Sequence, residues 1–247
     1  MAPVVLSSGE EAVLKINFPE VESEREPQAL AHWDGHGAVR LLEYDGGRRA
    51  LLIERCRPGA PLSRVEDEQQ ALRIAADILR RLWRPPPKQH SFRILAASAE
   101  RWASALVARW QRHGQPVERA LVEEAVSLGH ELARSQGELV VCHQDLRSAN
   151  VLSAARRPWL AIDPMPLVGE REFDTASLVR DRRADLLRDP HPARRIRRRL
   201  NQLSSELQLD RERVRAWGIV HAFAWGLAAK SVDVDSLACA RLLAEAR

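Results

Sequence analysis

The sequence predicts an α+β protein with a small antiparallel β lobe at its N-terminus and a larger helical lobe at its C-terminus. Strand-like apolar runs broken by turns fill residues 1–60, whereas apolar residues at helical spacing dominate from Leu62 onward. Pro58-Gly59 suits a crossing between lobes, so we place the lobes at residues 1–60 and 61–247. A cleft between two lobes is a common place for a ligand.

Two strand signals define the N-terminal lobe. Residues 12–18, AVLKINF, form a short apolar run with Lys15 at its centre. Residues 38–56 indicate a β-hairpin, because the Asp-Gly-Gly at 45–47 tolerates the positive φ angles of a tight turn. The lobe is therefore predicted to contain an antiparallel sheet.

A short helix is predicted between these two strand signals. Residues 25–34 lead to Gly35, which is typical of a helix end. Pro27 fits best in the first turn of a helix, because its missing N–H costs nothing there. The helix should therefore start near Arg25 or Glu26.

Helical spacing of apolar residues recurs through the rest of the chain. It predicts helices at residues 66–84, 102–114, 117–137, 174–188, 193–208, 210–231 and 233–247. Three short apolar runs interrupt this pattern and predict strands, at residues 139–143, 150–154 and 159–163.

The composition is that of a globular protein that buries a core, with 45% of the 247 residues hydrophobic. No apolar run is long enough to span a bilayer, and the N-terminus lacks the pattern of a secretory signal. The three cysteines, Cys56, Cys142 and Cys239, show neither metal-ligand spacing nor a disulfide framework. We therefore expect a reducing, cytoplasmic setting and no membrane partner.

The basic segment from Arg180 to Leu200 allows two interpretations. It could form a nucleic-acid patch, since the chain carries a net charge of +4. It could equally be a solvated helix face, because Asp181, Asp185 and Asp189 interleave with the arginines and no aromatic side chain is placed to stack bases. We favour the solvated face and expect no nucleic-acid partner.

Polar side chains bound the short strands in the middle of the chain. Asp145 follows one apolar run, Asn150 begins the next, and Asp163 ends the run WLAID. If residues 150–154 and 159–163 pair as a hairpin, Asn150 and Asp163 meet at its open end, within reach of Asp145. One carboxylate could then orient a hydroxyl, while two oxygen ligands hold Mg²⁺. Phosphoryl transfer uses this combination of groups.

The same residues carry a resemblance to a known family. HQDLRSANVL, residues 143–152, resembles the H-G-D-x-x-x-x-N loop of aminoglycoside phosphotransferases, and AIDP stands where protein kinases carry Asp-Phe-Gly. Blocks at residues 32–62, 159–174 and 210–227 resemble the streptomycin and hydroxyurea phosphotransferase family. The resemblance implies a protein-kinase-like two-lobe fold. It also implies an ATP-dependent O-phosphotransferase that inactivates an aminoglycoside such as streptomycin by phosphorylating a hydroxyl group.

The resemblance assigns roles to residues of the second lobe. Asp145 would accept the proton of the substrate hydroxyl, and His143 would brace the catalytic loop. Asn150 and Asp163 would hold Mg²⁺ and the phosphates. Asp174 would support the catalytic loop from beneath.

The resemblance also assigns nucleotide-binding roles in the first lobe. Lys15 matches the strand lysine that contacts the α- and β-phosphates of ATP, and Glu26 is the best match for its helical partner. Glu22 and Glu24 are alternatives to Glu26. Residues from Glu54 to Cys56 match the hinge whose backbone groups read the adenine edge.

Two features depart from the family pattern. The N-lobe is expected to be truncated at its start, because few residues precede Lys15 and residues 7–11, SSGEE, resemble the turn into the lysine strand. The first strand and the glycine-rich phosphate loop would then be missing or nearly so, leaving an exposed sheet edge. The usual glycine between the loop histidine and aspartate is Gln144, whose side chain could shift the loop or crowd the substrate.

Several alternatives stay open. The chain could be a non-catalytic or impaired kinase-like remnant, or could phosphorylate another small hydroxylated compound such as hydroxyurea. GTP could replace ATP, and the oligomeric state is open. Trp217 and Trp225 are interpreted as core residues rather than as a platform for the substrate.

Overall fold

The computed structural model describes residues 1–18 and 24–246 and divides into two compact units. The first unit combines residues 1–92 with 141–167, and the second combines 93–140 with 168–247. This division differs from the functional boundary predicted after residue 60, which stays a prediction. The chain therefore passes between the units more than once.

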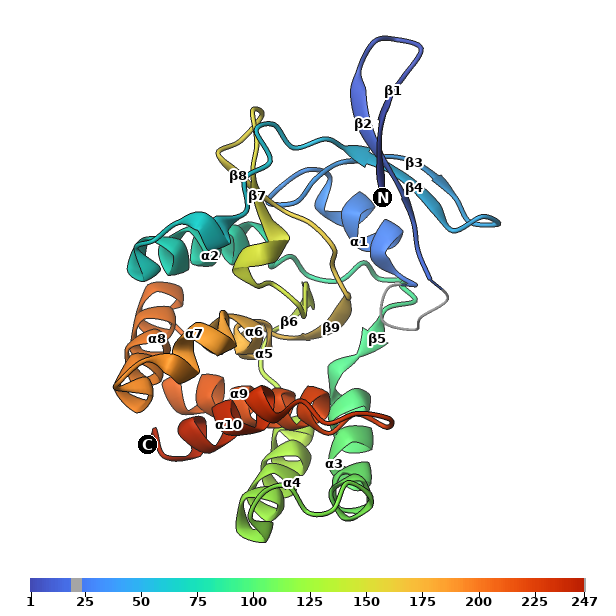
Figure 1. The fold of residues 1–247 in the computed structure, drawn as a ribbon. Coiled ribbons are helices and arrows are strands. Elements are labelled where there is room, and N and C mark those ends of the chain that lie inside the picture. Colours follow the sequence, from blue (N-terminus) through green and yellow to red (C-terminus); the bar gives the residue numbers. More distant parts are fainter. Residues whose placement is uncertain (19–23, 247) are drawn as a thin grey trace. The chain divides into compact units, whose positions relative to one another are not determined.

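The first unit contains a four-stranded antiparallel sheet with strand order β1-β2-β4-β3 (Figure 1). Its strands are β1 (Ala2–Val5), β2 (Glu11–Ile16), β3 (Leu41–Asp45) and β4 (Ala50–Glu54). β3 and β4 form the predicted hairpin, and Lys15 of β2 lies opposite Leu51 of β4. The lysine strand is thus an interior strand of the sheet.

A short strand and a tight turn precede the lysine strand. β1 pairs with β2, and the turn between them closes through hydrogen bonds from Leu6 N to Glu10 O and from Gly9 N to Leu6 O, each 2.9 Å long. The expectation that the first strand would be missing or nearly so is corrected, because the four residues of β1 form a strand that pairs with β2. The turn has one glycine, Gly9, and β1 lies at the sheet edge with Val5 exposed.

Helix α1 (Glu26–Trp33) has the predicted bounds. Arg25 is its N-cap, Pro27 lies in its first turn, and Asp34 and Gly35 end it in the left-handed region at φ 45° and 73°. It packs against β3, and Figure 1 shows it lying along the sheet. The buried side chains of Leu30 and Trp33 anchor the helix, which fixes the position of Glu26, its first residue.

The first unit also contains a helix and a two-stranded hairpin. These are α2 (Glu68–Leu82), the 3₁₀ turns η1 (Leu62–Arg64) and η2 (Ser148–Asn150), and the antiparallel strands β7 (Val151–Ser153) and β8 (Trp159–Ala161). The Asp67 side chain caps α2 by accepting hydrogen bonds from the backbone N–H groups of Gln69 and Gln70. The predicted hairpin of residues 150–154 with 159–163 is therefore present, as β7 and β8.

The second unit is mainly helical. Its helices are α3 (Leu95–Arg112), α4 (Arg119–Arg134), α5 (Arg171–Asp174), α6 (Ala176–Val179), α7 (Arg183–Arg188), α8 (Pro192–Leu207), α9 (Arg211–Gly226) and α10 (Val234–Ala244). Most residues of α9 are buried, and the helix packs against α3, α4, α5, α6, α8 and α10. The prediction of one helix over residues 174–188 is wrong. Arg182 adopts a left-handed φ of 49°, and two short helices, α6 and α7, replace the predicted one.

A second, smaller sheet has three strands. It contains β5 (Arg93–Ile94), β9 (Leu167–Glu170) and β6 (Leu139–Cys142), in that order. β9 was not expected, because all four of its residues are buried and show no alternation. A Cβ atom at Gly169 would lie 2.5 Å from Leu95, so this strand requires glycine for its close approach to α3.

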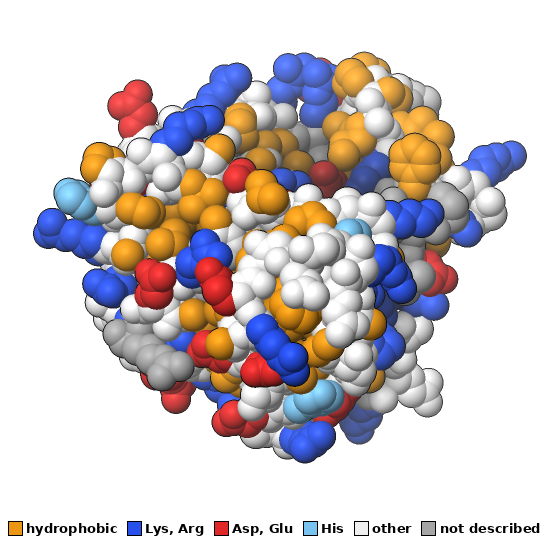
Figure 2. All heavy atoms as spheres, turned by 60° about the horizontal axis from the view of Figure 1, so that its bottom comes forward, with side chains coloured by type: hydrophobic (Ala, Val, Ile, Leu, Met, Phe, Trp, Pro, Cys, Tyr) orange, Lys and Arg blue, Asp and Glu red, His pale blue; other side chains and the backbone are white. Residues whose placement is uncertain are grey.

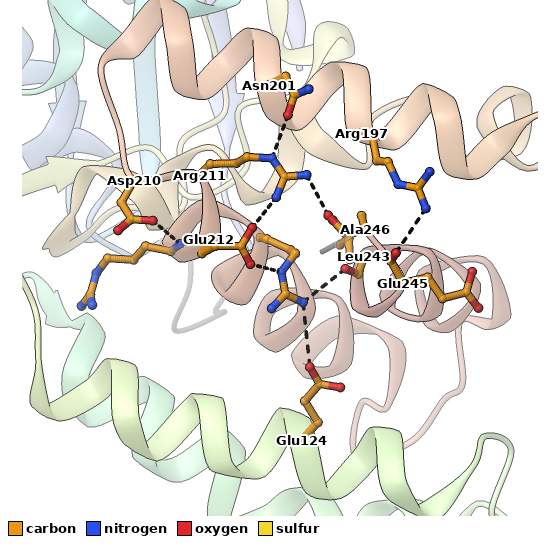
Figure 3. Close-up of polar contacts among 11 residues, drawn as sticks. Glu124, Arg197, Asn201, Asp210, Arg211, Glu212, Leu243, Glu245 and Ala246 are labelled. Carbon is orange, nitrogen blue, oxygen red and sulfur yellow. Dashed lines mark hydrogen bonds and ion pairs between the residues drawn. The ribbon is translucent and has the colours of Figure 1, made fainter.

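The arginines of the basic segment and of α9 serve largely within the second unit. Near the end of α10, Arg197 donates a hydrogen bond to the carbonyl of Glu245 and Arg211 to that of Ala246 (Figure 3). Arg215 donates to the carbonyl of Leu243. Arg180 and Arg199 are buried. On the face shown in Figure 2, basic side chains are interspersed with acidic and apolar ones. Within the described residues, no helix is both long and apolar enough to cross a membrane.

Candidate active site

The β7–β8 hairpin brings Asn150 and Asp163 to the same end, as the sequence predicts. Val151 pairs with Ala161, and the N–H of Ile162 donates a 2.9 Å hydrogen bond to the carbonyl of Asn150. Asn150 therefore precedes the hairpin on one strand and Asp163 follows it on the other. Asp163 has a left-handed φ of 56°, a strained conformation of the kind that often occurs at functional sites.

Lys15 joins this end of the hairpin to α1. Its Nζ donates hydrogen bonds to both carboxylate oxygens of Glu26, at 2.7 Å each, and to Oδ1 of Asp163, at 2.9 Å. Of the alternatives to Glu26, Glu24 pairs instead with Arg25 at 3.1 Å, and Glu22 lies outside the described residues. The structure thus brings together three of the predicted site residues, from β2, α1 and the end of β8.

Burial and charge act against each other in this cluster. Burial lowers the pKa of Lys15, but the carboxylates of Glu26 and Asp163 outweigh it and leave that pKa raised. Burial raises the pKa of Glu26, against the hydrogen bonds from Lys15 and Asn17. The Asn17 amide donates to Oε2 of Glu26 at 2.8 Å. Lys15 is therefore a positively charged side chain held in place by carboxylates.

The catalytic loop is organised around Asp145 and Asn150. The Asn150 side-chain amide donates hydrogen bonds to both the carbonyl and Oδ2 of Asp145, each 2.9 Å long. Arg147 Nε donates to the same Oδ2 at 3.2 Å. The Asp145 side chain is 20% exposed, so it keeps a face toward solvent while its orientation is set by the loop.

His143 is buried beneath this loop. Its Nε2 lies 3.0 Å from the carbonyl of Ile162, which can only accept, so Nε2 carries the proton. Burial lowers the pKa of His143 to about 4, and its ring stacks on Trp33 with centroids 6.1 Å apart. A neutral imidazole that ties the loop to the hairpin fits the predicted bracing role.

We expect the His143 site to make folding stability depend on acid. Because the unfolded histidine titrates near pH 6.5, the unfolded chain takes up a proton before the folded chain does as pH falls. The neutral His143 therefore contributes about 3 kcal/mol to the free energy of unfolding above about pH 6.5, and this contribution is lost as the pH falls toward about 4. Urea unfolding across this range should show a smaller loss for His143→Gln than for the unsubstituted chain. An identical acid loss in both would contradict the assignment.

Gln144 occupies a backbone position that favours glycine. Its φ is 70°, and the Asp145 N–H donates a 2.9 Å hydrogen bond to the carbonyl of His143, as in a γ-turn. This geometry explains why glycine is usual there, since a side chain at positive φ costs about 1 kcal/mol. The Gln144 side chain is buried, so it fits beneath the loop instead of projecting outward.

We expect Gln144→Gly to keep the loop and its turnover. Loss of a buried side chain and relief of strain act in opposite directions, so stability should change by less than about 1 kcal/mol. Gln144→Val should lower stability by more, about 2 kcal/mol, because β-branching is poorly tolerated at positive φ. Thermal unfolding and steady-state rates of the two variants test this. Equal stability of both variants would show that φ at this position carries no strain.

The predicted hinge, from Glu54 to Cys56, begins at the last residue of β4. The Glu54 side chain is paired with Arg156, so any contact of this segment with adenine would come from the backbone. Among the described residues, the N–H and C=O of Cys56 have no hydrogen-bond partner, which leaves them suited to a ligand's hydrogen bonds. Burial, together with the charge of Glu54, raises the pKa of the Cys56 thiol to about 11. The hinge role stays a prediction.

Comparison with known proteins identifies the family of this chain. Residues 1–233 match the family described as aminoglycoside/hydroxyurea antibiotic resistance kinase. The chain belongs to this kinase family. The reaction class predicted from Asp145, Asn150 and Asp163, transfer of a phosphoryl group to a hydroxyl group, is thereby confirmed.

Curated relatives and solved structures fit the assignment. The chain is 35% identical to streptomycin 6-kinase of Streptomyces glaucescens over 87% of its length and 69% of that protein's. It is 38% identical to hydroxyurea phosphotransferase of Kitasatospora aureofaciens over 87% of its length, but spans only 61% of that relative. Aminoglycoside phosphotransferase APH(3'')-Id from Streptomyces rimosus, solved with ADP and streptomycin, has a TM-score of 0.60 at 21% identity. The match covers 91% of this chain and 92% of that one, and shows the protein-kinase-like fold.

The oxygen donors of this kinase fit a divalent metal. The hydrogen bonds of the Asn150 amide nitrogen to Asp145 direct the amide oxygen away from that residue, and Asp163 supplies a carboxylate only partly engaged by Lys15. Mg²⁺ is usually held by one or two such oxygens together with substrate phosphates. Asn150 and Asp163 are therefore the residues that would hold it.

Two polar residues near the site were missed by the sequence argument. Asn17 follows Lys15 by two positions, so strand alternation places both on one face, and this signal could have revealed it. Arg156 lies in the polar turn between β7 and β8 and gave no local signal.

Three further predicted residues lie in the second unit. Trp217 is fully buried and donates to Glu170, as expected for a core residue, whereas Trp225 is half-buried and stacks on His221. Asp174 is buried, and its support of the catalytic loop stays a prediction.

Proposed function

We propose that this kinase uses ATP and Mg²⁺ to phosphorylate a hydroxyl group of an aminoglycoside of the streptomycin type. The observation that carries the proposal is the cluster of Lys15, Glu26 and Asp163 beside the hydrogen-bonded pair of Asp145 and Asn150. It combines a fixed cation, oxygen ligands for a metal and a carboxylate held by its loop. These are the groups that position phosphates and a nucleophile in phosphoryl transfer.

The chemistry assigned to these residues is a single in-line displacement. The substrate hydroxyl oxygen forms a bond to the γ-phosphorus, and the bond from that phosphorus to the bridging oxygen of ADP breaks. Asp145 accepts the hydroxyl proton, and Lys15 offsets negative charge on the phosphates. Mg²⁺, held by Asn150 and Asp163, would supply further charge neutralisation. The His143 imidazole stays neutral throughout, with its single ring proton on Nε2, because burial lowers its pKa.

The choice of acceptor rests on the relatives. Two relatives at 35% identity are named streptomycin 6-kinase, from Streptomyces glaucescens and Streptomyces griseus. Hydroxyurea is the second candidate, because the relative named hydroxyurea phosphotransferase is 38% identical. An aminoglycoside is the preferred acceptor because two of these relatives are named streptomycin kinases.

The test is turnover by the purified chain with Mg²⁺ and ATP. Streptomycin and hydroxyurea are supplied in parallel, with GTP in place of ATP as a further arm and Asp145→Ala as the inactive control. We expect streptomycin to gain the mass of one phosphoryl group in place of a hydroxyl hydrogen, dependent on both ATP and the metal. A folded protein that binds ATP but phosphorylates neither compound would refute the acceptor and favour a non-catalytic remnant.

A further inference from the structure

One arginine in the turn of the β7–β8 hairpin holds three segments of the first unit together. Arg156 donates from Nε and Nη2 to the two carboxylate oxygens of Glu54, at 2.8 Å each. Its Nη1 donates to the carbonyl of Gly35 at 2.8 Å, and Nη2 donates to the carbonyl of Ala38 at 3.2 Å. The guanidinium thus connects the hairpin turn, the end of β4 and the segment between α1 and β3.

The Arg156–Glu54 pair is built for fixed geometry. It is bidentate, and its side chains are only 23% and 17% exposed. A planar guanidinium matches a carboxylate in two parallel hydrogen bonds, which a lysine ammonium cannot reproduce. Burial raises the pKa of Glu54, but hydrogen bonds led by that from Arg156 leave it lowered, so the carboxylate stays charged.

Backbone hydrogen bonds hold the hairpin on both flanks. On the β8 flank, Ala161 N donates to Gly37 O at 2.8 Å and Val39 N donates to Ala161 O at 3.0 Å. On the β7 flank, Gly59 N donates to Ser153 O at 3.0 Å and Ser153 N donates to Ala60 O at 2.9 Å. The hairpin therefore lies between the segment after α1 and the segment after the predicted hinge.

We propose that Arg156 is a positioning residue that sets the metal-holding end of the hairpin relative to the hinge. Glu54 is the first residue of the predicted adenine-reading segment, and the open end of the hairpin whose turn holds Arg156 carries Asn150 and Asp163. Arg156 acts through these groups and does not touch the nucleotide. The inference rests on the proposed function, because it needs a nucleotide whose two ends are held by the hinge and the hairpin.

The same turn supplies a matched control. Arg157 is the next residue, is exposed, and has no hydrogen bond or ion pair with any other residue that the structure describes. Arg157→Ala removes the same charge and nearly the same atoms as Arg156→Ala. A difference between the two variants therefore reports the contacts of Arg156.

The experiment is calorimetric binding of AMP-PNP with and without Mg²⁺, with a melting temperature for every variant. We expect Arg156→Ala to lose about tenfold of the gain in affinity that Mg²⁺ provides, as is usual when support of a metal ligand is removed. Arg156→Lys should not restore it, since an ammonium cannot bridge both carboxylate oxygens. Arg157→Ala should match the unsubstituted chain. A purely structural role would lower the melting temperature and leave the Mg²⁺ gain intact.

Each result separates the two proposals. If Arg156→Ala keeps the Mg²⁺ gain of Arg157→Ala, the positioning role is wrong and the proposed function stands. If the unsubstituted chain does not bind AMP-PNP with Mg²⁺, the proposed function is wrong and this inference falls with it. If Arg156→Ala does not fold, Arg156→Lys carries the test, and an unchanged Mg²⁺ gain in that variant overturns the proposal.

Discussion

Replacing Asp145 by alanine is expected to lower kcat by about a thousandfold while nucleotide binding is retained. The carboxylate is the proposed acceptor of the substrate proton, and a positioned base of this kind is worth about 10²–10⁴ in rate. Its removal leaves Lys15, Glu26 and Asp163 in place, because none of their hydrogen bonds involves Asp145. Steady-state rates and AMP-PNP binding, measured on the same preparation, test the two halves of this expectation.

Asp145→Asn is the matched control for this substitution. It preserves size and a hydrogen-bonding oxygen for the Asn150 amide, but it cannot accept a proton. We expect kcat close to that of Asp145→Ala and a melting temperature close to that of the unsubstituted chain. A near-normal rate in either variant would show that Asp145 is not the base.

Asp163→Ala should abolish the dependence of nucleotide binding on Mg²⁺, in addition to turnover. Asp163 is the only carboxylate assigned to the metal, and Mg²⁺ bound through so few protein oxygens depends on each of them. The substitution also removes one of the two acidic residues that hold the Lys15 Nζ. Calorimetry with AMP-PNP should therefore give the same affinity with and without the metal.

Asp77→Ala is a suitable control, because Asp77 is an exposed aspartate on α2 whose ion pair among the described residues is with the nearby Arg80. It should bind AMP-PNP and Mg²⁺ like the unsubstituted chain, since exposed pairs contribute little. If Asp163→Ala retains the Mg²⁺ gain to within about threefold, the metal must be held by other residues.

The sequence predicts much of this site because its main contacts follow from local patterns. The turn between β7, which begins directly after Asn150, and β8, which ends two residues before Asp163, is short, so pairing of the two strands alone brings Asn150 and Asp163 together. Pro27 and Gly35 bracket α1 and place Glu26 at its start. Lys15 lies in a strand whose register follows from the adjoining hairpin.

The parts that were missed depend on contacts between distant segments. Arg156 and Glu54 are 102 positions apart in the sequence, and the residues of a polar turn do not indicate so distant a partner. β9 is buried on both faces, so it lacks the alternation that identifies a half-exposed strand. The break at Arg182 depends on a left-handed φ that an arginine does not favour by itself. Tertiary packing decides all three.

The two acidic partners of Lys15 have a consequence for the energetics of ligand binding. A lysine ammonium has three protons to donate, and its Nζ is within hydrogen-bond distance of three oxygens, those of Glu26 and Oδ1 of Asp163. An incoming phosphate must therefore compete with a carboxylate, and Asp163, once released, is available to a divalent cation. Nucleotide and cation should consequently show reciprocal linkage, each strengthening the binding of the other by the same factor. Ligand binding thus replaces one internal ion pair, Lys15 with Asp163, by two external ones, Lys15 with a phosphate and Asp163 with the cation.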